Sequence, residues 1–91
     1  MIYIVKDLSR NAKEIILEAL RKGGRISSKS QRIVPSLSFY VLIKDLKKLG
    51  IFEVDGNPKG GEEKFWRLTE KGKKIAKYLL EIRRILDEEK R

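Results

Sequence analysis

Apolar residues recur at helical spacing in three stretches of the chain, and the ends of each stretch carry residues that favour helix boundaries. The stretches span residues 9–22, 36–49 and 69–89. Gly23 and Gly50 follow the first two, and glycine is common just beyond the last residue of a helix. The residues suited to cap the three starts are Ser9, then Ser36 or Ser38, then Thr69. The pattern therefore predicts three main helices.

The segment between the first two helices is short and rich in serine. Residues 25–27 are long enough only for a minimal strand. We predict a short helix over residues 28–34, with Ser27 or Ser28 as its cap. Pro35 ends this helix, because proline lacks an N–H and disfavours helix in the residue before it.

Residues 51–68 combine two apolar runs with a turn-rich centre. The runs 51–54 and 64–68 have strand composition, and the residues between them include three glycines and a proline. This pattern predicts a β-hairpin with a glycine-rich tip. Trp66 and Leu68 share one face of the second strand, so we expect Trp66 in the core rather than as an exposed stacking platform.

Basic residues are concentrated in one part of the chain. The net charge is +9 at pH 7 over 91 residues, and residues 19–44 carry six lysines or arginines and no acid. An evenly solvated surface would not segregate its charge in this way, so the stretch indicates a polyanionic partner. The abundance of Lys, Arg, Glu and Ile is also typical of thermophiles and hints at an archaeal source.

The composition argues against several classes of function. The chain has no cysteine and no histidine, which removes disulfides, the usual zinc sites and the common catalytic dyads and triads. We therefore expect no enzyme, no metal and no cofactor. The apolar run at residues 1–5 is too short for a signal peptide, and no run is long enough to span a bilayer. We expect a cytoplasmic protein with no membrane partner.

Two motifs in the second half of the chain carry a family resemblance. They are Leu46-Lys-Lys-Leu-Gly-Ile-Phe-Glu-Val54 and Trp66-Arg-Leu-Thr-Glu-Lys-Gly72. In this order, joined by a loop of wing length, they resemble the winged-helix transcription regulators of the MarR and PadR type over residues 9–86. The resemblance implies one winged helix-turn-helix domain over residues 1–91. Its class is α+β, mainly α, with a long C-terminal dimerisation helix.

The same resemblance implies which side chains face DNA. The groove-facing positions of the recognition helix are Leu37, Ser38, Tyr40, Val41 and Lys44. Helical phasing agrees, because the apolar stripe through Phe39, Leu42 and Leu46 turns inward. Further predicted DNA contacts are Arg25, Lys29, Arg32, Ser36, Lys59 and Arg67. Such regulators commonly have arginine at the position of Val41, and no arginine lies on this helix. We therefore expect weak sequence recognition that depends mainly on the shape of the DNA.

The last helix carries more apolar surface than so small a domain can cover. A helix of about twenty residues is roughly 30 Å long, and its apolar residues follow a four-three-four spacing. Its first half can pack on its own domain. We expect its second half to pair with the same helix of a second subunit, helped by the arm at residues 1–5. The predicted dimer interface consists of Ile2, Ile4, Tyr78, Leu79, Ile82, Ile85 and Leu86.

Together these features predict a homodimer that binds double-stranded DNA and regulates transcription. A two-fold dimer would place two recognition helices about one turn of DNA apart. A chromatin-type architectural protein stays open as an alternative. So does a winged helix used for protein contact, because Leu37, Tyr40 and Val41 form an outward apolar patch. The sequence assigns no small-molecule effector.

Overall fold

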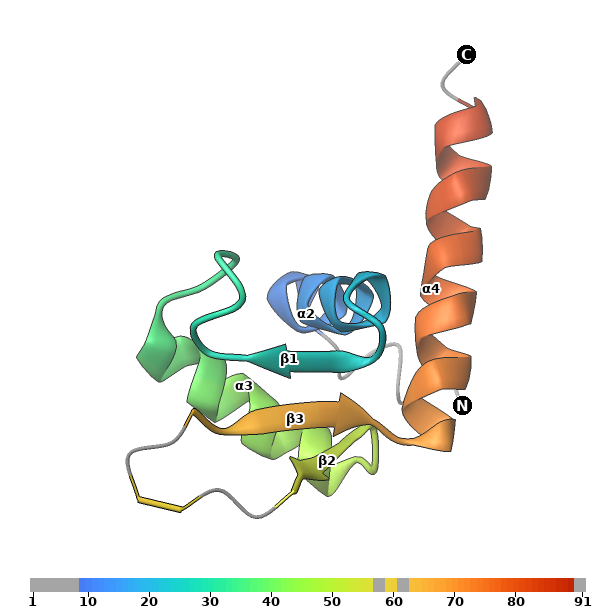
Figure 1. Cartoon of the computed structure of the whole chain (residues 1–91). Helices are drawn as coiled ribbons and strands as arrows, with labels where there is room; N and C mark the ends of the chain where they lie inside the picture. Colours follow the sequence, from blue (N-terminus) through green and yellow to red (C-terminus); the bar gives the residue numbers. More distant parts are fainter. Residues whose placement is uncertain (1–8, 57–58, 61–62, 90–91) are drawn as a thin grey trace.

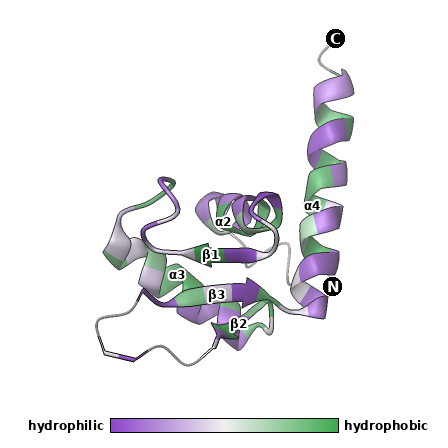
Figure 2. Ribbon diagram, viewed as in Figure 1, coloured by the Kyte–Doolittle hydropathy of each residue, from purple (hydrophilic) through white to green (hydrophobic). Residues whose placement is uncertain are grey.

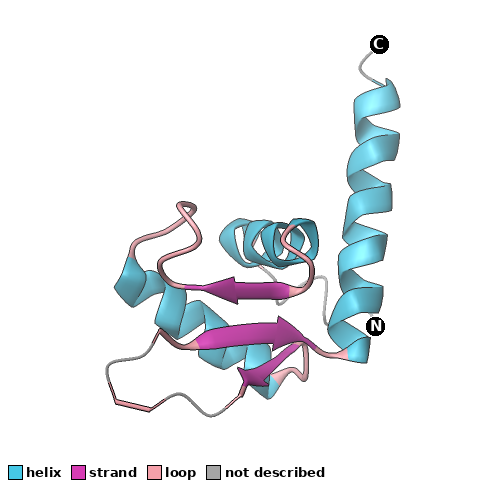
Figure 3. Ribbon diagram, in the orientation of Figure 1, coloured by secondary structure: helices cyan, strands magenta, loops and turns pink. Residues whose placement is uncertain are grey.

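The computed structural model describes residues 9–56, 59–60 and 63–89, which form three helices and three strands (Figures 1 and 3). In chain order the elements are α2 (Arg10–Arg21), β1 (Arg25–Ser27), α3 (Ser36–Lys48), β2 (Phe52–Asp55), β3 (Phe65–Leu68) and α4 (Glu70–Glu89). The mainly helical α+β class is confirmed, as is the minimal strand at residues 25–27. The predicted arm, with Ile2 and Ile4, lies outside the described residues. Of the helices described, none has the length and apolarity of a membrane span.

The three strands form one antiparallel sheet in the order β1-β3-β2. β3 is the central strand, and its Trp66 pairs with Ile26 of β1 and Val54 of β2. Because side chains alternate along a strand, Trp66 and Leu68 face inward while Arg67 faces away. α2 packs on β1 and β3, and α3 packs on β2. The two helices thus cover the inner face of the sheet and leave its outer face open (Figure 1).

The core fills the space between the two helices and the inner face of the sheet. The side chain of Trp66 is only 3% exposed, so its predicted place in the core is confirmed. Ala76 of α4 is also buried and joins this core to the last helix. The largest fully buried apolar side chains are Ile15, Ile16, Ile26, Phe39, Ile43, Leu46, Ile51 and Phe52.

Two of the three predicted helix caps are present. Ser9 Oγ accepts the N–H of Ala12 at 3.1 Å, and the hydroxyl of Thr69 accepts the N–H of Gly72 at 3.0 Å. The predicted capping of α3 by Ser36 or Ser38 is wrong. Pro35 is the N-cap residue, and its carbonyl accepts the N–H of Phe39 at 2.9 Å with no side-chain cap. Ser36 is already the first helical residue, so its hydroxyl instead accepts a hydrogen bond from Ser28 Oγ at 3.0 Å.

The predicted short helix over residues 28–34 is also wrong, because this segment is a turn followed by irregular chain. The buried Gln31 explains the difference. Its Nε2 donates to the carbonyls of Ser28 at 3.2 Å and Val34 at 2.7 Å, and its Oε1 accepts the N–H groups of Ile33 and Val34. A polar side chain that bonds nearby backbone groups in this way competes with helical hydrogen bonds. We call this segment, residues 28–34, the Gln31 loop.

The beginning of α4 is fastened to the chain that follows α3. The N–H of Thr69 donates to the carbonyl of Ile51 at 3.0 Å, and its hydroxyl donates to the carbonyl of Gly50 at 2.5 Å. The same hydroxyl accepts the N–H of Gly72 at 3.0 Å, which caps the helix. A Cβ on Gly72 would overlap the carbonyl oxygen of Ile51, so glycine is required there. We call these four residues the α3–α4 joint.

α4 projects beyond the rest of the molecule (Figure 1). The described chain measures 48 × 25 × 22 Å along its principal axes, and the length of α4 accounts for the longest of them. Every residue from 80 to 88 is exposed. Apolar positions nevertheless continue along this outer half of the helix, as Figure 2 shows. The outer half is therefore an amphipathic helix that its own domain leaves uncovered.

Candidate nucleic-acid interface

The outward face of α3 is apolar at its amino-terminal end. Leu37 is 83% exposed and Val41 is 63% exposed, which agrees with the outward phasing expected from the sequence. Tyr40 is 42% exposed, and its ring packs edge-on against the buried Phe39 with centroids 5.9 Å apart. Tyr40 is thus exposed, as expected, while its ring packs on a core residue. Ser38 is exposed beside them.

Four of the predicted phosphate contacts are exposed cations without a carboxylate partner among the residues that the structure describes. Lys29 and Arg32 lie in the Gln31 loop, Lys44 lies on α3, and Lys59 lies in the loop that joins β2 to β3. Figure 1 shows residues 59–60 of this loop and the start of α3 at the same end of the sheet. Contact of these cations with DNA stays a prediction, but their exposure leaves them available for it.

The other two predicted contacts are already paired with acids on the outer face of the sheet. Arg25 Nε lies 2.5 Å from Asp55 Oδ2, and its guanidinium lies 4.1 Å from the centroid of the Phe65 ring. Arg67 donates to Glu53 Oε1 at 2.6 Å and to Asp55 Oδ1 at 3.3 Å. The hydrogen bond with Glu53 and its charge raise the pKa of Arg67, so this side chain stays cationic at every physiological pH.

Sequence reasoning missed Asp55 and Gln31. Asp55 could have been found, because Glu53 and Asp55 are two residues apart on one strand and must therefore lie on the same face of the sheet. The outward residues of the paired strand lie on that face as well. No pattern in the sequence marked Gln31. Its role depends on burial of the amide at the centre of a loop, and burial of a single polar residue has no periodic signature.

The predicted dimer residues of α4 divide between two environments. Tyr78, Ile82, Ile85 and Leu86 are more than half exposed, whereas Leu79 is partly buried against the core. At 3.6 residues per turn, the four exposed side chains fall within a sector of about 100°. Leu80 is also an exposed apolar residue, on a different side of the helix, and was not among the predicted interface residues.

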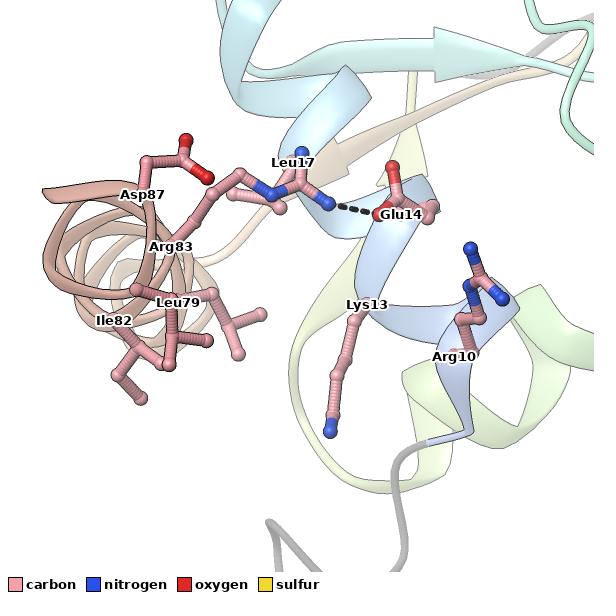
Figure 4. Close-up of a pocket in the computed structure, with 9 residues that line it drawn as sticks. Arg10, Lys13, Glu14, Leu17, Leu79, Ile82, Arg83 and Asp87 are labelled. Carbon is pink, nitrogen blue, oxygen red and sulfur yellow. Dashed lines mark hydrogen bonds and ion pairs between the residues drawn. The ribbon is translucent and has the colours of Figure 1, made fainter. Parts of the chain in front are cut away.

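A cleft of about 440 Å³ separates α2 from the outer part of α4 (Figure 4). Leu79 and Ile82 line its α4 side, and Arg83 reaches across to form an ion pair with Glu14 of α2. The cleft therefore borders the exposed apolar sector of α4. In the part of the chain that the structure describes, no cluster of acids could hold a metal ion.

Two helices on one face of a small antiparallel sheet, with a hairpin beside an exposed helix, define a winged helix-turn-helix protein. The chain belongs to the HxlR-like helix-turn-helix family, whose sequence profile matches residues 8–90. The resemblance to winged-helix transcription regulators is thereby confirmed at the level of family and fold. No protein of curated function matches the chain significantly.

Two solved structures share this fold. The organohalide-sensing transcriptional regulator RdhR, in its ligand-free form, is similar with a TM-score of 0.72 and 20% identity, over 84% of this chain and 46% of that chain. The adhesin competence repressor AdcR from Streptococcus pyogenes is similar with a TM-score of 0.70 and 16% identity, over 89% of this chain and 61% of that chain. This chain thus spans about half to three fifths of the two regulators it matches.

Proposed function

We propose that this protein binds double-stranded DNA as a homodimer and regulates transcription in the cytoplasm. The observation that carries the proposal is a set of exposed cations without a carboxylate partner among the described residues. Lys44 lies on α3, Lys29 and Arg32 lie in the Gln31 loop just before α3, and Lys59 lies in the loop that joins β2 to β3. Their arrangement on a winged helix-turn-helix suits a helix in the major groove with cations on the flanking phosphates. RdhR and AdcR are a transcriptional regulator and a repressor, which supports regulation rather than catalysis.

Each part of the surface has a distinct role in this proposal. The Gln31 loop holds Lys29 and Arg32 against the sugar-phosphate backbone beside the groove that α3 enters. Lys59 extends the contact from the wing loop to the next phosphates. These contacts fix position and orientation but carry no sequence information. Binding of this kind uses no metal and no cofactor.

The exposed sector of α4 supports the dimer. Tyr78, Ile82, Ile85 and Leu86 form an apolar stripe on a helix that extends past its own domain, and such a stripe is stabilised by a matching helix. A two-fold axis near the outer half of α4 would present both α3 helices to one side of a duplex. The structure describes a single chain, so the dimer rests on this uncovered surface.

The test is salt-dependent binding to a 30-base-pair duplex, measured by fluorescence anisotropy. Each cation that releases a phosphate counterion contributes about one unit to the slope of log K against log salt. We expect the triple variant Lys29→Ala, Arg32→Ala, Lys44→Ala, which removes six cations from a homodimer, to lose affinity and about five units of slope. The matched control replaces Lys73, Lys74 and Lys77, three exposed lysines of α4, by alanine. If both triple variants bind alike, DNA does not use this surface.

Protein contact is the second candidate, because Leu37 is almost fully exposed on the same face. In that case the affinity for a DNA duplex would be weak and would not change when Lys29, Arg32 and Lys44 are replaced by alanine. Substitution of Leu37 and Val41 by serine would then abolish binding to a protein partner without changing the salt slope for DNA.

A further inference from the structure

The apolar residues on the outward face of α3 are uncovered by anything in the described part of the molecule. Leu37 and Val41 lie four residues apart, so their side chains stand on the same side of the helix about 6 Å apart. An apolar pair held in water at this position is unfavourable unless a partner covers it. The proposed function places this face in the major groove, and the inference below rests on that function.

The chemistry of α3 restricts which features of DNA it can recognise. Ser36–Lys48 contains no arginine, asparagine or glutamine, so lysine is the only one of the usual readers of guanine and adenine on this helix. Lys44, one turn after Tyr40 and Val41, is the nearest cation on the helix. The one major-groove feature that apolar side chains recognise is the C5-methyl group of thymine.

We propose that Leu37 and Val41 recognise thymine methyl groups, so that the target half-site is rich in thymine. Charge complementarity supports DNA as the occupant, because the exposed Lys44 lies on the same face of α3 and the exposed Lys29 and Arg32 lie in the Gln31 loop just before this helix. The spacing also fits. The two side chains are about 6 Å apart along the helix, and two base steps span about 6.8 Å, so both reach methyl groups within one half-site.

The experiment begins with selection of bound duplexes from a random pool at fixed salt. The selected duplex is then synthesised with deoxyuridine in place of thymidine inside the half-site, which removes only the methyl groups. We expect affinity to fall about fourfold for each methyl group that the side chains cover. The same replacement outside the half-site serves as the control and should leave affinity unchanged.

Protein variants assign the effect to these two residues. Val41→Ser and Leu37→Ser each remove the apolar surface of one position. Both positions are exposed, so folding should be unaffected. We expect each variant to lose discrimination between thymine and uracil duplexes while its salt slope stays normal. Arg32→Ala should do the reverse, with a lower salt slope and unchanged discrimination.

The outcomes separate this inference from the proposed function. Salt-dependent binding with equal affinity for thymine and uracil duplexes would overturn thymine recognition and leave DNA binding intact. Selection of sites poor in thymine, or of no consensus at all, would likewise overturn thymine recognition and leave DNA binding intact. Absence of salt-dependent duplex binding would overturn both and assign the apolar pair to a protein partner.

Discussion

The carboxylate of Asp55 lies 2.5 Å from Nε of Arg25, across the outer face of the sheet. Its second oxygen lies 3.3 Å from Arg67 Nη1, so one acid of β2 pairs with an arginine on each of the other two strands. Both arginines were expected to bind phosphate from the sequence. In the free protein Arg25 is paired with Asp55 and Arg67 with both Asp55 and Glu53, so a phosphate would have to compete with these acids.

Asp55→Asn should therefore strengthen DNA binding. The substitution keeps the size of the side chain and frees Arg25, while Arg67 keeps its hydrogen bond with Glu53. Affinity and the salt slope should both rise, the slope by about one to two units for a dimer with one freed arginine in each subunit. Stability should change by less than about 1 kcal/mol, because ion pairs this exposed contribute little. Anisotropy titrations over a range of salt concentrations measure the slope. Glu81→Gln on α4 controls for the change in net charge. If Asp55→Asn and Glu81→Gln bind DNA with the same affinity and salt slope, the freed arginine does not reach phosphate.

Gly72→Ala should destabilise the fold by about 3 kcal/mol, because the new Cβ would overlap the carbonyl oxygen of Ile51 and force the α3–α4 joint apart. Thermal unfolding followed by the fluorescence of Trp66, the only tryptophan, measures the change. Gly60→Ala is the matched control. No atom of the described residues lies within 4 Å of a Cβ there, so stability should stay within about 0.5 kcal/mol of the parent. Equal stability of the two variants would contradict the role of Gly72.

Gln31→Ala should lower both stability and DNA affinity. It removes four hydrogen bonds between the amide and the loop backbone, and we expect a loss of about 1–3 kcal/mol. Lys29 and Arg32 would then lose their fixed positions, so the salt slope should fall as well. Arg32→Ala separates the two effects, because that side chain is exposed and should change binding but not stability. A Gln31 variant with unchanged stability would show that the amide does not organise the loop.

Ile82→Arg should convert the proposed dimer to a monomer. The side chain is exposed in the single chain, so the charge would not harm folding but would be buried against a second subunit. Light scattering at micromolar concentration measures the mass, and DNA affinity should fall with loss of the second half-site. Lys77→Glu lies about 140° away around the helix and should leave the mass unchanged. A monomeric parent protein would disprove the dimer directly.

The elements with a repeating pattern were the ones that the sequence predicted. The apolar period of 3.6 placed all three helices within a residue or two, and the alternation at Trp66 and Leu68 placed β3 and its inward face. Thr69 and Gly72 belong to the second of the two family motifs. Their geometry explains the motif, since one supplies the cap and the other makes room for Ile51.

The parts that the sequence did not predict depend on single contacts. The predicted helix at residues 28–34 does not form, because the amide of Gln31 makes hydrogen bonds with the backbone groups that a helix would pair with one another. The DNA surface was predicted as one set of cations, but Asp55 divides it, with Arg25 and Arg67 paired and Lys29 and Arg32 free of described partners. Charge along the sequence could not reveal that division, because it arises only when three strands come together.

The α3–α4 joint makes α4 a lever whose pivot is next to the end of the recognition helix. A tilt of about 10° at the pivot would displace the far end of a helix roughly 30 Å long by about 5 Å. That movement exceeds one base step of about 3.4 Å. In the proposed dimer, the distance between the two α3 helices would therefore depend on the geometry at Gly50, Thr69 and Gly72. Half-site spacing would then be set at the pivot and base preference on the face of α3, so that each could evolve without the other.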